Sequence, residues 1–275
     1  MLMAPALPES GQFANFRRMI ASRAMLDACL TKIERDGFAV LPGVFDEPAV
    51  EAIAAQLSPA LSATRDEAES IRSRAGTVYA ARNVVTLWPE VRDVWRRPAI
   101  VELLSAALGR EFGLVRVLYF DKPPERSWSL PWHKDLTIAV RDNSLPSERL
   151  RRPTTKAGVP HVEASLDVLS TMLTVRVHLD QVTEENGPLK VIPGSHHQGK
   201  QSAATAAAFQ SILVAPGDVL AIRPLVAHSS DLSHPGTTRR RRILHFEFSG
   251  LPRLPDGFEW HDFYPGMPNG IHSAG

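Results

Sequence analysis

Apolar residues recur at helical spacing in three stretches of the first part of the chain. They fall three or four positions apart in 20–36, 47–63 and 96–109, which is the period of an amphipathic helix. Gly109 closes the last stretch and is typical of a helix end. Pro59 is expected to kink or divide the middle one. The pattern therefore predicts that the chain begins with helices.

Short apolar runs that are rich in β-branched residues and bounded by Gly or Pro predict strands. Two of them lie among the helices, at 38–45 and 77–87. From Phe112 onward such runs dominate, at 113–122, 170–182, 187–195, 217–230 and 241–250. Many short strands with turn signals between them favour a β-sandwich or a β-barrel.

The segment 140–169 interrupts this β pattern. It contains Pro, Ser and several arginines but has little periodicity. A loop of this length inside a compact domain is usually a lid or a binding loop, so we treat it as a candidate active-site lid. No change in composition marks a linker. We therefore expect one domain over 1–275, with a largely helical preface over 1–110 and a β core over 111–250.

Composition narrows the class of protein further. The 275 residues are 44% hydrophobic and 22% charged, as in ordinary globular proteins. Lys+Arg 31 against Asp+Glu 30 gives a net charge of +1, which argues against a nucleic-acid partner. The single cysteine, Cys29, cannot form an internal disulfide. The sequence contains no apolar run of about 18 residues and no secretory signal pattern. We therefore expect a cytoplasmic protein with no membrane partner.

Histidine and acidic residues pair at a spacing that suits metal binding. Residues i and i+2 of a strand share a face, so His-x-Asp or His-x-Glu can offer an imidazole and a carboxylate to one cation. Four such pairs occur: His133/Asp135, His161/Glu163, His178/Asp180 and His245/Glu247. A site of two histidines and one carboxylate also needs a ligand from a remote strand and leaves positions open for substrate and dioxygen. His228, after the run PGDVLAIRPLVAH, is the best distant candidate.

For the other histidines of these pairs and for His196 and His197, we expect roles other than metal binding. We expect His178/Asp180 to be a polar pair on a sheet face and His161/Glu163 to be solvated. We expect His245/Glu247 to face the interior and either to support the metal ligands from behind or to be structural. Adjacent residues of an extended chain point to opposite faces. His196 and His197 therefore cannot both easily bind one metal, and we expect them at the rim of a site.

Four segments together resemble the phytanoyl-CoA dioxygenase family. They are PWHKDLTIAV (131–140), EENGPLKVIPGSHHQG (184–199), GDVLAIRPLVAHSS (217–230) and RRILHFEFSG (241–250). The likeness covers about residues 37–250. It implies an oxygenase that depends on Fe(II) and the co-substrate 2-oxoglutarate. It also implies a mainly β fold with flanking helices, a double-stranded β-helix of the jelly-roll, cupin-like kind.

The resemblance also implies roles for individual residues. His133, Asp135 and His228 match the iron ligands. Because the carboxylate of Asp135 is present, hydroxylation or a related oxidation is expected rather than halogenation. The family binds the remote carboxylate of 2-oxoglutarate with an Arg on the strand after the distal His. Alignment of ILHFEFSG selects Arg241, whereas the usual spacing selects Arg239. Ser230 matches a hydroxyl that also binds this carboxylate.

Several alternatives remain open at the level of sequence. A non-enzymatic or zinc-dependent metal-binding barrel would keep the three ligands without needing Arg241. The arginine run 239–242 also has a plainer reading as a solvated basic patch. The substrate is expected to be a small molecule, and the cations of 140–169 are candidates to recognise an anionic group on it. Lys122 and Arg82 are further candidates to line the pocket. No particular oligomeric state is predicted.

Overall fold

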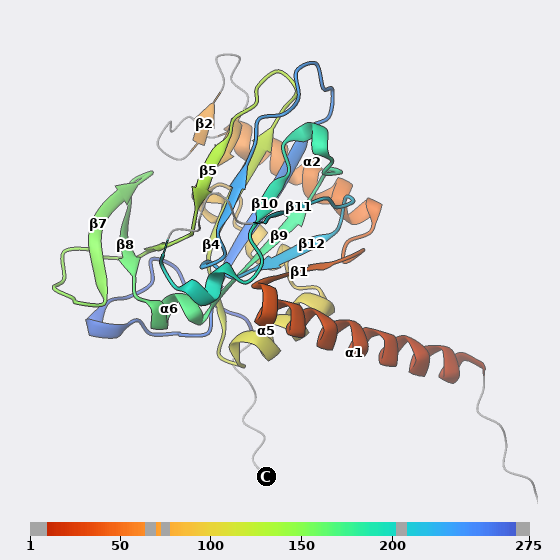
Figure 1. The fold of residues 1–275 in the computed structure, drawn as a ribbon, viewed down its shortest axis with the longest axis horizontal. Coiled ribbons are helices and arrows are strands. Elements are labelled where there is room, and N and C mark those ends of the chain that lie inside the picture. Colours follow the sequence, from red (N-terminus) through yellow and green to blue (C-terminus); the bar gives the residue numbers. More distant parts are fainter. Residues whose placement is uncertain (1–9, 64–69, 73–77, 202–207, 268–275) are drawn as a thin grey trace, which may run out of the picture.

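The computed structural model describes residues 10–63, 70–72, 78–201 and 208–267. Its largest sheet is antiparallel and forms the centre of the molecule (Figure 1). In spatial order its strands are β1 (Phe38–Leu41), β12 (Val219–Ile222), β9 (Met172–His178), β14 (Arg241–Ser249), β4 (Gly113–Lys122), β3 (Val78–Ala81) and β2 (Ser70–Arg72). The short strand β15 (Tyr264–Pro265) also pairs with β4. Strands β1, β2 and β3 join this sheet from within the first 110 residues, among the helices expected there.

A second antiparallel sheet lies against the first. Its spatial order is β11 (Gln210–Ile212), β10 (Leu189–Val191), β13 (His228–Ser230) and β5 (Leu130–His133). Apolar side chains of β10 and β11 share one buried cluster with those of β1 and β12 from the main sheet. This arrangement confirms the predicted double-stranded β-helix.

The two faces of the main sheet have different chemistry. Along β14, Leu244, Phe246 and Phe248 pack into a large apolar cluster on the outer side. The alternate positions, from Arg241 to Glu247, point the other way, toward the second sheet, because successive strand residues face opposite sides. Polar side chains are therefore concentrated on the inner face of the sheet.

Helices cover the outer face of the main sheet. They are α1 (Ser10–Asp36), α2 (Glu47–Ala63), α3 (Val84–Leu87), α4 (Val91–Val94) and α5 (Pro98–Leu108). Figure 1 shows the C-terminal end of α1 beside α5 and β1, with the rest of this helix extending away from the sheets. Pro59 does not divide α2, which continues past it. The run 77–87, expected to be one strand, changes from β3 to α3 at Asn83.

The segment 140–169 is not the irregular loop expected from its sequence. It carries β7 (Leu150–Lys156), β8 (Val159–Ala164) and α6 (Leu166–Ser170), and β8 also pairs with β6 (Thr137–Ala139). Most of β7 is exposed, so it lacks the apolar alternation that reveals a strand. Val162 and Val168 pack with Trp260 in a separate apolar cluster.

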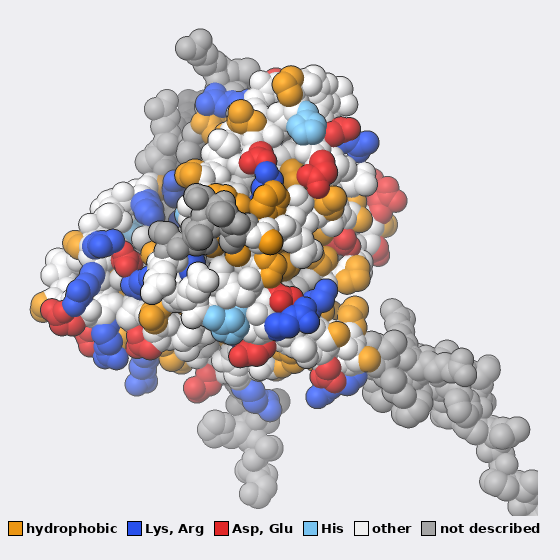
Figure 2. All heavy atoms as spheres, viewed as in Figure 1, with side chains coloured by type: hydrophobic (Ala, Val, Ile, Leu, Met, Phe, Trp, Pro, Cys, Tyr) orange, Lys and Arg blue, Asp and Glu red, His pale blue; other side chains and the backbone are white. Residues whose placement is uncertain are grey.

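Short 3-10 helices complete the described elements, at Glu184–Asn186, Ser195–Gln198 and Pro255–Gly257. On the face drawn in Figure 2, acidic and basic side chains are intermingled, as expected for a net charge of +1. Among the described residues, the helices lack the combination of length and apolar character that crossing a lipid bilayer requires.

Candidate functional site

Three side chains from separate stretches of sequence meet at one end of the second sheet. His133 on β5 lies directly opposite His228 on β13, and Asp135 follows β5 by two residues. Their candidate ligand atoms all lie within 4.8 Å of one another. The Asp135 carboxylate oxygens lie 3.7 Å from Nε2 of His133 and 3.6 Å from Nε2 of His228. We refer to these three residues as the triad.

Hydrogen bonds to the backbone orient both imidazole rings. Nδ1 of His133 lies 2.7 Å from the Pro131 carbonyl oxygen, and Nδ1 of His228 lies 2.9 Å from that of Val226. Because a carbonyl oxygen only accepts hydrogen bonds, Nδ1 carries the proton in each ring. The unprotonated Nε2 atoms therefore face Asp135, as a metal site of this type requires.

The electrostatics of the triad also suit a divalent cation. Burial lowers the pKa of His228 to about 4, so its ring is neutral near pH 7. Desolvation alone would raise the pKa of Asp135, but electrostatic interactions with His228, His245, His133 and Arg176 outweigh it and lower this pKa. The side chain of Asp135 remains 39% exposed, so the triad is open on one side. Two imidazoles and one carboxylate with an open side fit a non-haem iron centre.

The structure distinguishes the two candidate arginines. Strand β14 begins at Arg241, whose side chain is buried on the inner face of the sheet. Its Nε and Nη1 atoms have no hydrogen-bond partner among the described residues. Burial lowers the pKa of Arg241 to about 9. Arg239 precedes the strand and is exposed, and its guanidinium pairs with Glu185 at 3.2 Å. Of these two arginines, therefore, only Arg241 is free to receive a ligand inside the fold.

Lys122 is another buried polar residue, and it lies beside Arg241. It lies opposite Arg241 in the pairing of β4 with β14, and its side chain is fully buried. Its Nζ donates to Oγ of Ser230 at 3.2 Å, which links the two sheets. The turn at Gly187 leaves room for this amine, because a Cβ there would lie 2.9 Å from Nζ. Burial lowers the pKa of Lys122 to about 6.

Among the described residues, the other three His-x-acid pairs do not join the triad in one metal-binding group, although His245 is close enough to act electrostatically on Asp135. In the first pair, His178 is buried on the inner face of the sheet, whereas Asp180 binds Arg242. In the second pair, His245 lies 3.5 Å from Glu247 inside the fold. In the third pair, Glu163 forms ion pairs with Arg152 and Lys200. His161 is buried on β8, so the expectation that it is solvated is wrong. The reason is that the segment around it folds as a hairpin instead of a loop.

His196 and His197 lie in a 3-10 helix rather than in an extended chain. Their rings are in contact in a tilted arrangement, with centroids 3.9 Å apart. Nε2 of His196 lies 3.1 Å from the Glu34 carbonyl oxygen near the end of α1. His196 therefore connects this 3-10 helix to α1.

The cations of 140–169 are mostly engaged at the surface. The pairs are Arg141–Glu259, Arg149–Asp256, Arg151–Glu148 and Arg152–Glu163. Lys156 differs, because it is half-buried and donates to Oγ1 of Thr137 at 2.8 Å. The charges of Asp135 and Glu247 both act on Lys156, so the tip of this hairpin approaches the triad.

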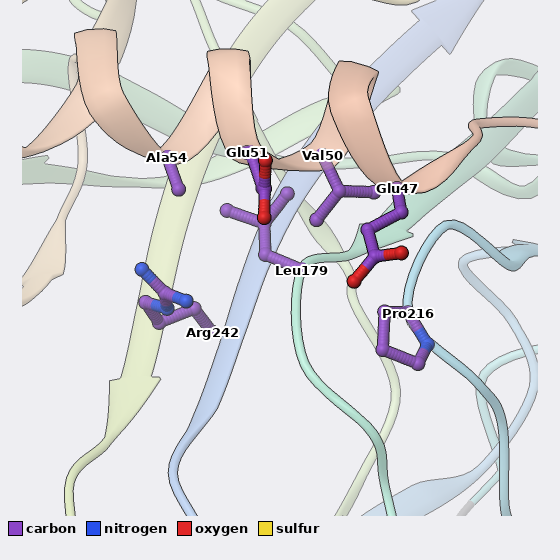
Figure 3. Close-up of a pocket in the computed structure, with 7 residues that line it drawn as sticks. All are labelled: Glu47, Val50, Glu51, Ala54, Leu179, Pro216 and Arg242. Atoms are coloured by element: carbon purple, nitrogen blue, oxygen red, sulfur yellow. The ribbon is translucent and has the colours of Figure 1, made fainter.

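A separate pocket lies outside the two sheets, between α2 and the ends of β9 and β14 (Figure 3). Its charged lining residues are Glu47, Glu51 and Arg242. The guanidinium of Arg242 already binds Asp180 at 2.7 Å and 2.9 Å. This pocket therefore offers no free cation and is distinct from the triad.

Several known proteins are similar to this chain. L-Proline trans-4-hydroxylase of Streptomyces griseoviridis is 27% identical over 66% of this chain and 59% of its own length. Ectoine dioxygenase of Bordetella parapertussis is 27% identical over 60% of this chain and 47% of its own. The chain thus spans about half the length of these curated relatives.

A solved structure supports the fold. The epimerase SnoN in complex with Fe3+, alpha ketoglutarate and nogalamycin RO superimposes with a TM-score of 0.60 and 18% identity, over 90% of this chain and 96% of that one. The family model described as phytanoyl-CoA dioxygenase (PhyH) matches residues 33–242. Because this match spans well over half of the sequence, the chain belongs to the phytanoyl-CoA dioxygenase family.

Proposed function

We propose that this protein is an oxygenase that depends on Fe(II) and 2-oxoglutarate. It oxidises a small organic substrate with dioxygen and releases succinate and CO2. The observation that carries this proposal is the open triad together with an unpaired, buried Arg241 on the facing sheet. A barrel that only bound zinc would not need this guanidinium.

In this proposal His133, Asp135 and His228 hold the iron. The iron, when bound with its co-substrate, supplies the activation of dioxygen and the redox chemistry. The protein contributes ligand orientation, because the Pro131 and Val226 carbonyls fix the ring tautomers. It also keeps the ligand set open toward solvent through Asp135, which leaves room for ligands to enter.

Arg241, Ser230 and Lys122 bind the remote carboxylate of 2-oxoglutarate. Arg241 suits this role because its planar guanidinium binds a carboxylate through two parallel hydrogen bonds. Lys122 already contacts Ser230 and lies opposite Arg241, so the three groups surround one position. An incoming anion would compensate the buried charge of Arg241 and would favour the protonated form of Lys122.

Hydroxylation or a related oxidation is the reaction class we favour. Asp135 retains the carboxylate that a halogenating relative would lack. The relatives named as a hydroxylase and a dioxygenase support an oxidation, and the epimerase SnoN indicates that the outcome varies on this fold. We further propose that the chain acts as one catalytic domain in the cytoplasm, without a nucleic-acid or membrane partner.

An anaerobic titration tests the proposed function. Adding Fe(II) and 2-oxoglutarate to the protein is expected to give a weak visible absorption band, and metabolite screening in air is expected to find compounds that stimulate succinate release. Absence of both the band and succinate would overturn the oxygenase proposal. Zinc-dependent turnover without 2-oxoglutarate would support the metal-binding barrel instead.

A further inference from the structure

Arg176 is a second buried arginine on the inner face of the main sheet. It lies on β9 directly opposite His245 of β14, and its side chain is 6% exposed. Its Nε atom has no hydrogen-bond partner among the described residues. His245 is four positions from Arg241 on β14, which corresponds to about 13 Å along the strand. Arg176 and Arg241 therefore lie on the same inner face but at different positions along the strands.

The charge of Arg176 affects groups on both sides of it. It lowers the pKa of Asp135 in the triad, and it also lowers the pKa of Arg241 and of Lys122. Asp135 in turn acts on Arg176. Arg176 is thus within electrostatic range of both the triad and the position proposed for the remote carboxylate of 2-oxoglutarate.

The inner carboxylates are already engaged with other partners. Asp135 faces the two imidazoles of the triad, and Glu247 pairs with Arg116 at 3.6 Å and with His245 at 3.5 Å. A buried guanidinium without an ion-pair partner is costly, so buried charges are normally paired or bind a ligand. A cation left unpaired in this position therefore indicates a binding role for an anion.

We propose that Arg176 binds a carboxylate of the primary substrate, so that the substrate of this enzyme is a small organic acid. This inference rests on the proposed function. In that function both carboxylates of 2-oxoglutarate already have partners, at the iron and at Arg241 with Ser230 and Lys122. Arg176 remains for the substrate, and its planar guanidinium can bind a carboxylate through two parallel hydrogen bonds.

Thermal unfolding of the protein loaded with Mn2+ and saturating 2-oxoglutarate tests this assignment, because Mn2+ binds without supporting turnover. Propionate serves as the carboxylate probe, with propionamide as its neutral counterpart and chloride and phosphate as other anions. If propionate binds this protein with a dissociation constant of about 10 mM, adding about 50 mM propionate is expected to raise the Tm of the protein by about 2 °C. Propionamide and chloride give no such rise.

Arg176→Met is expected to abolish the response to propionate, whereas Arg176→Lys keeps a weakened response. Arg152→Met, at an exposed arginine that pairs with Glu163, is the matched control and keeps the full response. The ligand-free Arg176→Met protein is expected to unfold at a Tm equal to or above that of the wild type, because an unpaired buried charge has been removed. A structural arginine would instead lower Tm when replaced.

Four outcomes would overturn the inference. They are a wild-type protein that does not respond to propionate, an Arg176→Met protein that still responds, a larger response to phosphate than to propionate, and a loss of 2-oxoglutarate affinity in Arg176→Met. Calorimetric titration of 2-oxoglutarate into each Mn2+ protein measures that affinity separately. If even the wild type does not bind 2-oxoglutarate, the proposed function fails. The propionate response of Arg176 can still be measured on the Mn2+ protein.

Discussion

His133 and His228 lie directly opposite one another on paired antiparallel strands, with ring centroids 4.3 Å apart. The pairing of β5 with β13 therefore determines the separation of two candidate metal ligands that are distant in sequence. Asp135 joins them from the residues just after β5. The sheet register, rather than a flexible loop, holds the two imidazoles of this site in place.

Removal of one triad residue tests the metal site directly. Asp135→Ala is expected to lower the affinity for Fe(II) or Co2+ by at least ~100-fold. The reason is that losing a metal ligand should cost more affinity than losing a residue that only orients a ligand. Isothermal titration of the metal-free protein measures the change. His197→Ala, at an exposed histidine outside the triad, should bind metal like the wild type. Equal affinities for the two variants would contradict the assignment.

A matched pair of arginine variants tests the 2-oxoglutarate site. Arg241→Gln is expected to weaken 2-oxoglutarate binding by about 100-fold, because it removes one partner of a buried charge pair. Arg239→Gln removes a similar side chain that is exposed and pairs with Glu185, so the affinity of this variant for 2-oxoglutarate should equal that of the wild type. Binding to the Mn2+ protein is measured by calorimetry. The opposite order of effects would assign the co-substrate to Arg239.

Lys122 makes stability depend on pH in a predictable direction. Its pKa is lowered to about 6 by burial, whereas an unfolded lysine keeps its ordinary value of 10.5. Between these values the unfolded chain binds one more proton than the folded protein, so Lys122 makes stability increase as pH rises. The contribution is about 1.4 kcal/mol per pH unit.

Urea unfolding of the ligand-free protein between about pH 6.5 and pH 8.5 measures this slope. The free energy of unfolding of the wild type, relative to that of Lys122→Met, should increase over the range. Lys32→Met, at an exposed lysine of α1, should instead follow the wild type in parallel. Parallel profiles for wild type and Lys122→Met would show that Lys122 remains protonated in the folded state.

The outer face of the main sheet depends on an aromatic cluster. Trp95 is fully buried and contacts Phe248 of β14 with ring centroids 4.9 Å apart and Phe112 at 5.8 Å. Trp95→Ala is expected to lower the free energy of unfolding by about 3–5 kcal/mol, because it leaves a cavity between the helices and the sheet. Denaturant unfolding tests this. A loss below about 1 kcal/mol would mean that the helical layer contributes little to the stability of the sheet.

The sequence by itself determined the main elements and the candidate ligands. Apolar spacing located α2 and β4, because one-sided burial leaves a period of 3.6 or 2 in the sequence. It failed for β7, because a strand that exposes most of its residues carries no such period. The quoted motifs were sufficient to select the three triad residues from ten histidines and many acids.

Only the tertiary structure decided which charged residues face the interior. Arg239 and Arg241 would share a face on one continuous strand, but β14 begins at Arg241, so Arg239 lies in the preceding loop and pairs with Glu185. Arg176 lies within an apolar run, and nothing local indicates that it has no partner. Whether a buried charge is paired depends on strands that are distant in sequence, and chain folding alone brings those strands together.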